Sequence, residues 1–555
     1  MKRELDALTD RIFDLVVIGG GIYGACVAWE AASRGLSVAL LEKDDFAAAT
    51  SANSLKIIHG GFRYLQHGDL LRMRVSMSER KILMRTAPHL VHPLPVLVPT
   101  YGHGLKGREA FSLGLAINDL LSFDRNQLED PQKHIPPGRT ISRSACLEQL
   151  PGLDSRGLNG GAVFYDAQVY NSERLVLAYL HSASRAGAVL ANYAEVTAFL
   201  RRGDRIIGVR VNDRVHGQQF DVRARLVINT SGPWIGHVLG YLSHQGHPPF
   251  QLAKAINLVT KPLFSDYAVG LLGSNGYLDK ETLLHKGTSL LFVAPWRGYS
   301  LIGTSYQAYT GSPDDMKATE QDVLGLLASI NLAYPEAQLK QNDVTHVHAG
   351  LLPSRWLGQN GSIQLAQHYQ IHDHRRDGLN GMLSVIGVKY TTARHVAEKT
   401  LDRVFKYWGY SPVPPVSAAL PLYGGEIERF ETYLQAEIQK QPCGLEANAV
   451  RSLVLNYGSA YPDVLACFDY TSDGQPLEPE QGLLKAQVLY AVRAEMALKL
   501  ADVVLRRTES GTAGHPGRGP LHFSAQVMGA ELGWDAVRIA QEVKEVEQQF
   551  FLSQS

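Results

Sequence analysis

The stretch that most constrains this chain is residues 14–42. Residues 14–18 form an apolar run, residues 19–24 carry the motif G-x-G-x-x-G, and the next ten residues place apolar and small side chains at helical spacing. A second apolar run, which begins after a glycine at position 35, ends at Glu42. This order predicts a strand, a tight turn, a helix and a parallel second strand, which together form a βαβ unit.

The glycines and the acid of this unit predict that it binds a dinucleotide. Gly19 allows the sharp turn, Gly21 allows backbone N–H groups to approach a pyrophosphate, and Gly24 allows the helix to lie close to the sheet. The helix N-terminus adds partial positive charge. Glu42 would accept hydrogen bonds from ribose hydroxyls, and its charge disfavours the 2′-phosphate of NADP. The alternative interpretation is a buried glycine turn without a ligand.

The residues that follow Glu42 favour FAD over NAD. Positions 43–66 are polar and small and show no hydrophobic period, which is typical of a loop along a ligand rather than of another βα unit. The hydroxyl groups of Thr50, Ser51 and Ser54 can bond to a phosphate or a ribityl chain. Gly60 allows the backbone to approach a flat ring.

Residues 50–65 also resemble a known family. They read T-S-x-x-S-x-K-x-I-H-G-G-x-R-Y-L, which is similar to the motif of the FAD-dependent glycerol-3-phosphate dehydrogenases and their oxidase relatives. Further similar segments lie at 230–234, 295–304 and 387–394, so the resemblance covers nearly the whole chain. It implies tightly bound, non-covalent FAD. Together with the motifs it predicts these cofactor-binding residues: Gly19, Gly21, Gly24, Glu42, Lys43, Thr50, Ser51, Ser54, Lys56, His59, Gly60, Val196, Gly232, Trp234, Gly350, Gly387 and Lys389.

The length of 555 residues indicates two or three domains rather than one core. We predict an α/β chain with a Rossmann-like FAD-binding fold, an antiparallel β substrate domain and an α-helical C-terminal domain. The oxidoreductase module would span 1–410. Its FAD-binding parts would lie at about 10–90, 150–235 and 375–405, and its substrate or cap parts at about 91–149 and 236–374. A Pro- and Gly-rich linker at 411–425 would lead to the helical domain at 426–555.

Charge and cysteine content exclude several classes of protein. Lys+Arg and Asp+Glu both number 54, so nothing favours a nucleic-acid partner. The four cysteines lack metal-ligand spacing, which predicts reduced thiols and no metal site. No run of eighteen apolar residues and no signal peptide is present, which predicts a cytoplasmic protein. The resemblance implies electron transfer to a membrane quinone, and it leaves open peripheral contact with the inner face of the membrane and a homodimer.

Residues 387–392 are suited to the side of the site that accepts electrons. A reduced flavin gains negative charge at the N1/C2 edge of its ring, and a cation or a helix N-terminus there stabilises it. Gly387 permits contact, Lys389 supplies charge, and a helix that begins at Thr391 or Thr392 directs its N–H groups back to the ring. The alternative for Lys389 is a solvated lysine at a helix start.

The donor side needs a base for the hydroxyl proton. His59 is the candidate, because it titrates near neutral pH and matches a family position beside the substrate. Arg63 would hold an anionic group, and Tyr64 would contact a hydroxyl. The predicted catalytic residues are therefore His59, Arg63, Tyr64, Lys389 and Thr391. A purely structural histidine at position 59 remains the alternative.

The chain departs from the family pattern on the substrate side. Leu352 replaces the arginine of G-x-R-P, Asn257 replaces the histidine of K-G-S-H, and Tyr306 replaces the aspartate of G-T-T-D. With the flavin motifs intact, these changes predict an altered substrate and weak use of glycerol 3-phosphate. Arg355 is a candidate to compensate, and a surface position is its alternative.

The function expected from these residues is oxidation of a secondary hydroxyl of a small polar alcohol or polyol phosphate by hydride transfer to FAD. Quinone or oxygen would then accept the electrons. One alternative is an oxygen-using oxidase of a hydroxy acid or amine, and another is a non-catalytic flavoprotein.

Overall fold

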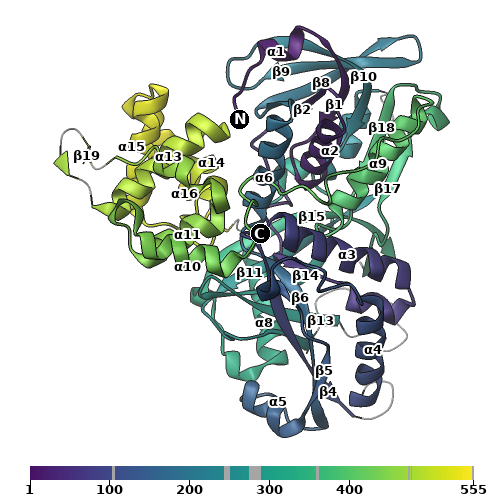
Figure 1. The fold of residues 1–555 in the computed structure, drawn as a ribbon, viewed down its shortest axis with the longest axis vertical. Coiled ribbons are helices and arrows are strands. Elements are labelled where there is room, and N and C mark those ends of the chain that lie inside the picture. Colours follow the sequence, from purple (N-terminus) through teal and green to yellow (C-terminus); the bar gives the residue numbers. More distant parts are fainter. Residues whose placement is uncertain are drawn as a thin grey trace.

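The computed structural model of the protein describes residues 1–102, 107–242, 250–273, 289–357, 362–469, 471–472, 475–476 and 478–552. Two large sheets form the body of the molecule, and a helical domain built from the C-terminal part of the chain lies beside them (Figure 1). This arrangement confirms the predicted fold class. None of the helices in these ranges has the length and apolar character needed to span a bilayer.

The first sheet contains the predicted βαβ unit. Strand β1 (Ile12–Ile18), helix α2 (Ile22–Ser33) and strand β2 (Val38–Leu41) follow one another, and β1 and β2 pair in parallel. The central strand order is β17-β18-β10-β1-β2-β7. Its remaining strands are β7 (Val189–Ala191), β10 (Gln219–Asn229), β17 (Gln370–Asp373) and β18 (Met382–Ile386). Because β1, β2, β7, β10 and β18 run parallel, their carboxyl ends meet at one edge, where ligands of such sheets bind.

Both faces of this sheet are covered. Helix α2 packs against α6 (Ser172–Arg185) and α9 (Ala393–Tyr407) on one face, and these helices share a buried apolar core with the strands. The other face packs against the antiparallel ribbon of β8 (Ala194–Arg202), β9 (Arg205–Asp213) and the start of β10. Burial on both faces explains why β1 and β2 read as continuous apolar runs rather than as alternating ones.

The second sheet is the antiparallel sheet expected beside the flavin domain. Its order is β16-β15-β11-β14-β13-β12-β4-β6-β3, and all its pairings are antiparallel except that of β12 with β4. Its strands are β3 (Ile57–Ile58), β4 (Val91–Tyr101), β5 (Arg139–Ser142), β6 (Leu158–Val169), β11 (Gln251–Thr260), β12 (Ala268–Gly273), β13 (Ser289–Trp296), β14 (Tyr299–Tyr309), β15 (Val344–Leu357) and β16 (Ser362–Leu365). Strand β3 belongs to the loop that follows Glu42, so this loop joins the two sheets.

The C-terminal part of the chain is helical, as expected. Its helices are α10 (Phe430–Lys440), α11 (Ala447–Tyr457), α12 (Tyr461–Leu465), α13 (Pro479–Glu495), α14 (Leu500–Asp502), the π-helix η11 (Val503–Arg507), α15 (Arg518–Leu532) and α16 (Ala536–Gln548). They enclose two apolar clusters of their own. The segment 411–425 has neither helix nor strand, but Leu422 and Tyr423 are buried and the N–H of Leu422 donates to the carbonyl of Thr86. The segment 411–425 is therefore packed against the rest of the protein and is not a free linker.

Buried histidines make the fold sensitive to acid. Burial lowers the pKa of His89 to about 3 and that of His181 to about 4, from an ordinary value of 6.5. At a pH between the lowered pKa and 6.5, each of these histidines binds a proton in the unfolded chain but not in the folded chain. The contribution of these neutral histidines to the free energy of unfolding is then full above about pH 6.5. It falls as the pH drops towards 4, in total by about 1.4 kcal/mol for each unit by which the folded and unfolded pKa values differ.

We expect denaturant titrations of the FAD-free protein at pH 7, 6, 5 and 4 to show this loss. His181→Gln, which removes one of the titrating groups, should flatten the slope. His522→Gln should leave the slope unchanged, because the His522 side chain is exposed on α15. An unfolding free energy that is constant from pH 7 to 4 would contradict this account.

Candidate active site

A cavity of about 310 Å³ runs along the carboxyl edge of the first sheet and reaches the second sheet. The β1–α2 turn, the loop after β2, the start of β8, the turn after β10, strand β15 and the turn after β18 all contribute to its walls. Twelve of the predicted cofactor-binding residues line it: Gly19, Gly21, Glu42, Lys43, Thr50, Ser51, Ser54, Val196, Gly232, Trp234, Gly387 and Lys389. Segments that are far apart in the sequence thus meet around one elongated space.

The turn between β1 and α2 has room only for glycine. Gly19 has a φ of +105°, and a Cβ there would lie 2.9 Å from the carbonyl oxygen of Thr230. A Cβ at Gly24 would lie 1.8 Å from the carbonyl oxygen of Gly19, so any larger residue would push α2 away from the turn. Helix α2 begins at Ile22, whose N–H donates to the hydroxyl of Ser51 at 3.0 Å, and the positive end of the helix faces the cavity. These features fit the pyrophosphate of a dinucleotide.

Glu42 is held in place by backbone groups on both sides. Its carboxylate accepts hydrogen bonds from the N–H of Gly20 at 2.7 Å and from the N–H of Asp44 at 2.9 Å. Burial is the main influence on this group and raises its pKa to about 7. Both carboxylate oxygens are thus fixed at the end of β2 beside the cavity, and the ribose-binding role of Glu42 stays a prediction.

Lys43 and Trp234 form the cavity wall next to Glu42. The ammonium group of Lys43 lies 2.7 Å from the carboxylate of Asp314 and 4.7 Å from the centre of the Trp234 ring. The indole N–H of Trp234 donates to the same carboxylate at 3.0 Å. Lys43 therefore links the loop after β2 to the turn after β10.

The turn that carries Lys389 is held by Tyr23, a residue that the sequence analysis did not single out. The hydroxyl of Tyr23 accepts from the N–H groups of Val388 and Lys389, both at 3.1 Å, and donates to the carbonyl of Lys389 at 2.7 Å. A Cβ at Gly387 would collide with the Tyr23 ring at 2.1 Å. Tyr23 occupies a variable position of G-x-G-x-x-G, so the motif gives no signal for it.

Lys389 itself is half-buried beside aromatic and cationic groups. Its ammonium nitrogen lies 3.6 Å from the centre of the Tyr64 ring, and the Arg72 guanidinium lies 4.1 Å from the same ring centre. Burial first, and then the charge of Arg72, lower the pKa of Lys389 to about 6. Helix α9 starts at Ala393, with Thr392 at the N-cap position and Thr391 buried just before it.

His59 lies close to Tyr64, with ring centres 5.9 Å apart in an edge contact. The turn that follows His59 is held by a buried ion pair. The N–H of Gly60 donates to Asp166 at 2.5 Å, and Asp166 pairs with Arg80 at 2.9 Å. Asp166 and Arg80 were also missed from the sequence. The side chain of Arg63 lies outside the described part of the chain.

The remaining predicted cofactor residues support the cavity without lining it. Lys56 is buried, and its ammonium group bonds to Glu173 at 3.0 Å and to Ser172 at 3.1 Å. Gly350 packs against Thr50, whose hydroxyl donates to the carbonyl of Leu351 at 3.0 Å and accepts from the N–H of that residue at 3.1 Å. The Thr50 contacts hold the 50–58 loop on β15, and the Lys56 contacts hold it on α6.

Of the residues that depart from the family pattern, Leu352 lines the cavity and the others do not. Asn257 is buried in the second sheet, where its side-chain oxygen accepts from the hydroxyl of Thr304 at 2.6 Å. Tyr306 lies on β14 opposite Ala255. Arg355 is exposed on β15, so the structure gives no support to a compensating role in the cavity.

Among the described residues, one group outside the cavity has metal-ligand chemistry. Side-chain atoms of His372, His374 and Asp377 lie within 4.8 Å of one another. Both imidazoles contact the same carboxylate oxygen, at 2.6 and 3.0 Å. None of the three lines the cavity.

The sheet, the glycine turn and the cavity define a dinucleotide-binding flavoprotein. The family model described as FAD dependent oxidoreductase matches residues 14–393, and the one described as C-terminal domain of alpha-glycerophosphate oxidase matches residues 416–539. The chain therefore belongs to the FAD-dependent oxidoreductase family, in the group of the glycerol-3-phosphate dehydrogenases and oxidases, and its cofactor is FAD.

Three relatives illustrate this similarity. A glycerol-3-phosphate dehydrogenase of Synechocystis sp. is 34% identical, with 91% of this chain and 90% of that protein covered. An alpha-glycerophosphate oxidase of Streptococcus pyogenes serotype M3 is 31% identical, with coverage of 91% and 89%. The crystal structure of glycerol-3-phosphate dehydrogenase from Bacillus halodurans complexed with FAD superposes with a TM-score of 0.76 at 25% identity and covers 99% of this chain and 97% of that chain.

Proposed function

We propose that the protein oxidises a secondary hydroxyl group of a small polar alcohol or polyol phosphate. Bound FAD supplies the hydride acceptor for this reaction. The observation that supports the proposal most is that Lys389 and Leu352 line the same cavity, while Tyr64 and His59 follow Lys389 in a chain of ring contacts. A basic group, a phenol and an imidazole are thus gathered where a polar substrate would meet the flavin.

His59 is proposed as the group that takes the hydroxyl proton. A neutral imidazole is a competent base near neutral pH, and the Gly60 turn that follows it is fixed by Asp166. Lys389 would gain a proton when negative charge develops beside it, because a nearby anion raises the pKa of an amine. Burial and the charge of Arg72 lower the pKa of this lysine to about 6, which favours the neutral amine at pH 7 before substrate oxidation.

Quinone is the electron acceptor that we propose, reached by peripheral contact with a membrane. Helix α4 (Arg108–Leu121) and the residues after it carry large exposed apolar side chains, with Leu113 64%, Leu120 75% and Phe123 75% exposed. An amphipathic face of this kind suits the boundary between headgroups and acyl chains. Oxygen is the second candidate, supported by the similarity to an alpha-glycerophosphate oxidase.

The proposal predicts that a secondary alcohol bleaches the yellow flavin in the absence of oxygen. We would mix FAD-loaded protein anaerobically with glycerol 3-phosphate, glycerol, other sugar-alcohol phosphates, hydroxy acids and amines, and follow flavin absorbance. At least one alcohol or polyol phosphate should bleach it fully. Bleaching by an amine or a hydroxy acid alone would favour the oxidase alternative. No bleaching by any compound would favour a non-catalytic flavoprotein.

A further inference from the structure

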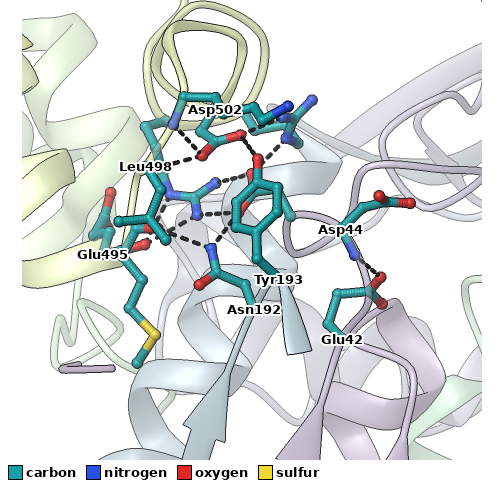
Figure 2. Close-up of polar contacts among 12 residues, drawn as sticks. Glu42, Asp44, Asn192, Tyr193, Glu495, Leu498 and Asp502 are labelled. Atoms are coloured by element: carbon teal, nitrogen blue, oxygen red, sulfur yellow. Dashed lines mark hydrogen bonds and ion pairs between the residues drawn. The ribbon is translucent and has the colours of Figure 1, made fainter. Parts of the chain in front are cut away.

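We propose that the C-terminal helical domain positions the adenosine end of the FAD site through a buried ion-pair network. This Asp45 network consists of Asp45, Asn192, Tyr193, Asp502, Arg506 and Arg507. The first three residues lie directly behind the cavity wall, and the last three belong to the C-terminal domain. Figure 2 shows how the two sets meet.

Asp45 receives both arginines of the network. The guanidinium of Arg507 donates to its two carboxylate oxygens at 2.6 and 2.8 Å, and Arg506 Nε donates at 2.5 Å. Asp45 is 1% exposed and Arg507 is 0% exposed, so water does not screen this contact. Burial alone would raise the pKa of Asp45, but the charges of Arg507 and Arg506 hold it below its ordinary value. The carboxylate is therefore charged and fully paired.

The second carboxylate, Asp502, balances the second arginine. Arg506 contacts Asp502 at 2.8 Å, and Asp502 also accepts from the hydroxyl of Tyr193 at 2.7 Å and from the N–H of Leu498 at 2.8 Å. Two carboxylates thus face two guanidinium groups, although burial and the neighbouring charge of Asp45 raise the pKa of Asp502. Charges buried this deeply are tolerated only when they are paired and hydrogen-bonded, which makes the relative position of the two domains specific.

Both arginines come from the irregular helix η11. η11 is a π-helix over Val503–Arg507, with a wider turn than α-helix. Such turns often mark functional positions, and here both arginines bond to Asp45.

The network leads directly to the group that binds the ribose. Asp45 follows Glu42, Lys43 and Asp44, which line the cavity. The carbonyl of Glu42 accepts from the N–H of Ala194 at 2.7 Å, and the carbonyl of Asp44 accepts from the N–H of Tyr193 at 2.9 Å. The loop after β2 and the turn before β8 are therefore joined by backbone bonds.

The C-terminal domain holds that turn as well as the loop. The side-chain amide of Asn192 donates to Asp45 at 3.1 Å and to the carbonyl of Met496 at 2.8 Å. Tyr193 has a φ of +52°, a conformation that costs energy for a residue with a side chain and persists only where contacts enforce it. Its bond to Asp502 is such a contact. Loss of the C-terminal contacts would release both segments that surround the adenosine.

FAD affinity and domain contact are then coupled. If the network favours the arrangement that binds adenosine, bound FAD must favour the network by the same factor. Removal of Arg507 leaves Arg506 as the one guanidinium group of the network between the two buried carboxylates, and buried charge that is not fully paired is strongly destabilising. Arg507→Gln should therefore raise the Kd for FAD at least tenfold, and the Kd for ADP, which carries only the adenosine half, by a similar factor.

The test measures FAD binding by flavin fluorescence and ADP binding by calorimetry on the full-length FAD-free chain. Arg493→Gln is the matched control, because its exposed pair with Glu531 at 2.6 Å lies in the same domain outside the network. It should leave both Kd values unchanged. Once saturated with FAD, Arg507→Gln should be bleached by substrate at the wild-type rate, because the ring end is untouched.

A purely structural role for the network would give a different result. Arg507→Gln would then lower the unfolding midpoint while its folded fraction bound FAD and ADP with wild-type Kd values, and the proposal would be overturned. If Arg507→Gln fails to fold, Tyr193→Phe removes only the hydroxyl bond to Asp502. That variant should still raise the Kd for ADP severalfold, and an unchanged Kd for ADP in this folded variant would likewise refute the proposal.

Discussion

His59→Ala is expected to retain FAD and to slow anaerobic bleaching by substrate roughly a hundredfold or more, the range in which positioned proton transfer contributes. His59 adjoins Tyr64, which stacks on Lys389 at the cavity, so removal of its imidazole takes away the base without opening the dinucleotide site. Rapid mixing of FAD-loaded protein with substrate measures the rate. His522→Ala, at an exposed histidine on α15 outside the cavity lining, should bleach at the wild-type rate.

Lys389→Ala tests the flavin side of the same hydride transfer. Burial and the charge of Arg72 lower the pKa of Lys389 to about 6. The rate of wild-type flavin reduction should therefore rise as the pH increases through this value, because the neutral amine is the form that can take up a proton, and the variant should lose this dependence along with most of its rate. Lys485→Ala, which breaks an ion pair with Asp469 in the C-terminal domain, serves as the control. Wild-type bleaching rates in both His59→Ala and Lys389→Ala would assign these residues a structural role only.

The parts of the fold that could be predicted from the sequence are those in which the immediate surroundings of a residue require a particular residue type. Gly19 and Gly24 are needed because a Cβ at either position would meet backbone atoms, and β1 and β2 are apolar throughout because helices and a ribbon cover both faces. Such requirements appear in the sequence as a motif and a period. The glycines, hydroxyl residues and Glu42 could therefore be assigned to one ligand site from their order along the chain.

The supports of the site could not be predicted in this way. Tyr23 binds a turn 366 residues later, and Arg507 binds Asp45 across 462 residues. Neither contact has a sequence period, because each depends on how whole elements pack. The same limit applies to Arg355, whose spacing from Leu352 suggested a shared site. Leu352 lines the cavity, whereas Arg355 is exposed on β15.

Leu352→Arg is expected to improve the apparent affinity for glycerol 3-phosphate by roughly ten- to a hundredfold. A charge-assisted contact between arginine and phosphate contributes about 1.5 to 3 kcal/mol, and position 352 lies in the cavity wall together with Lys389. The measurement is the substrate concentration that gives half-maximal bleaching rate. Leu352→Met, which keeps the volume without the charge, should show no gain.

The natural protein should correspondingly use glycerol 3-phosphate poorly. If the protein instead oxidises glycerol 3-phosphate at micromolar concentration, another cationic side chain must bind the phosphate. The structure favours one of two arginines for this role. Arg355 is exposed outside the cavity lining, whereas Arg72 lies on the Tyr64 ring that also contacts Lys389. Arg72→Ala would then weaken the binding of glycerol 3-phosphate by roughly ten- to a hundredfold and leave the binding of glycerol unchanged. Arg355→Ala would leave the binding of both compounds unchanged. A loss confined to Arg355→Ala would show instead that β15 turns its exposed arginine towards the substrate when the site is loaded.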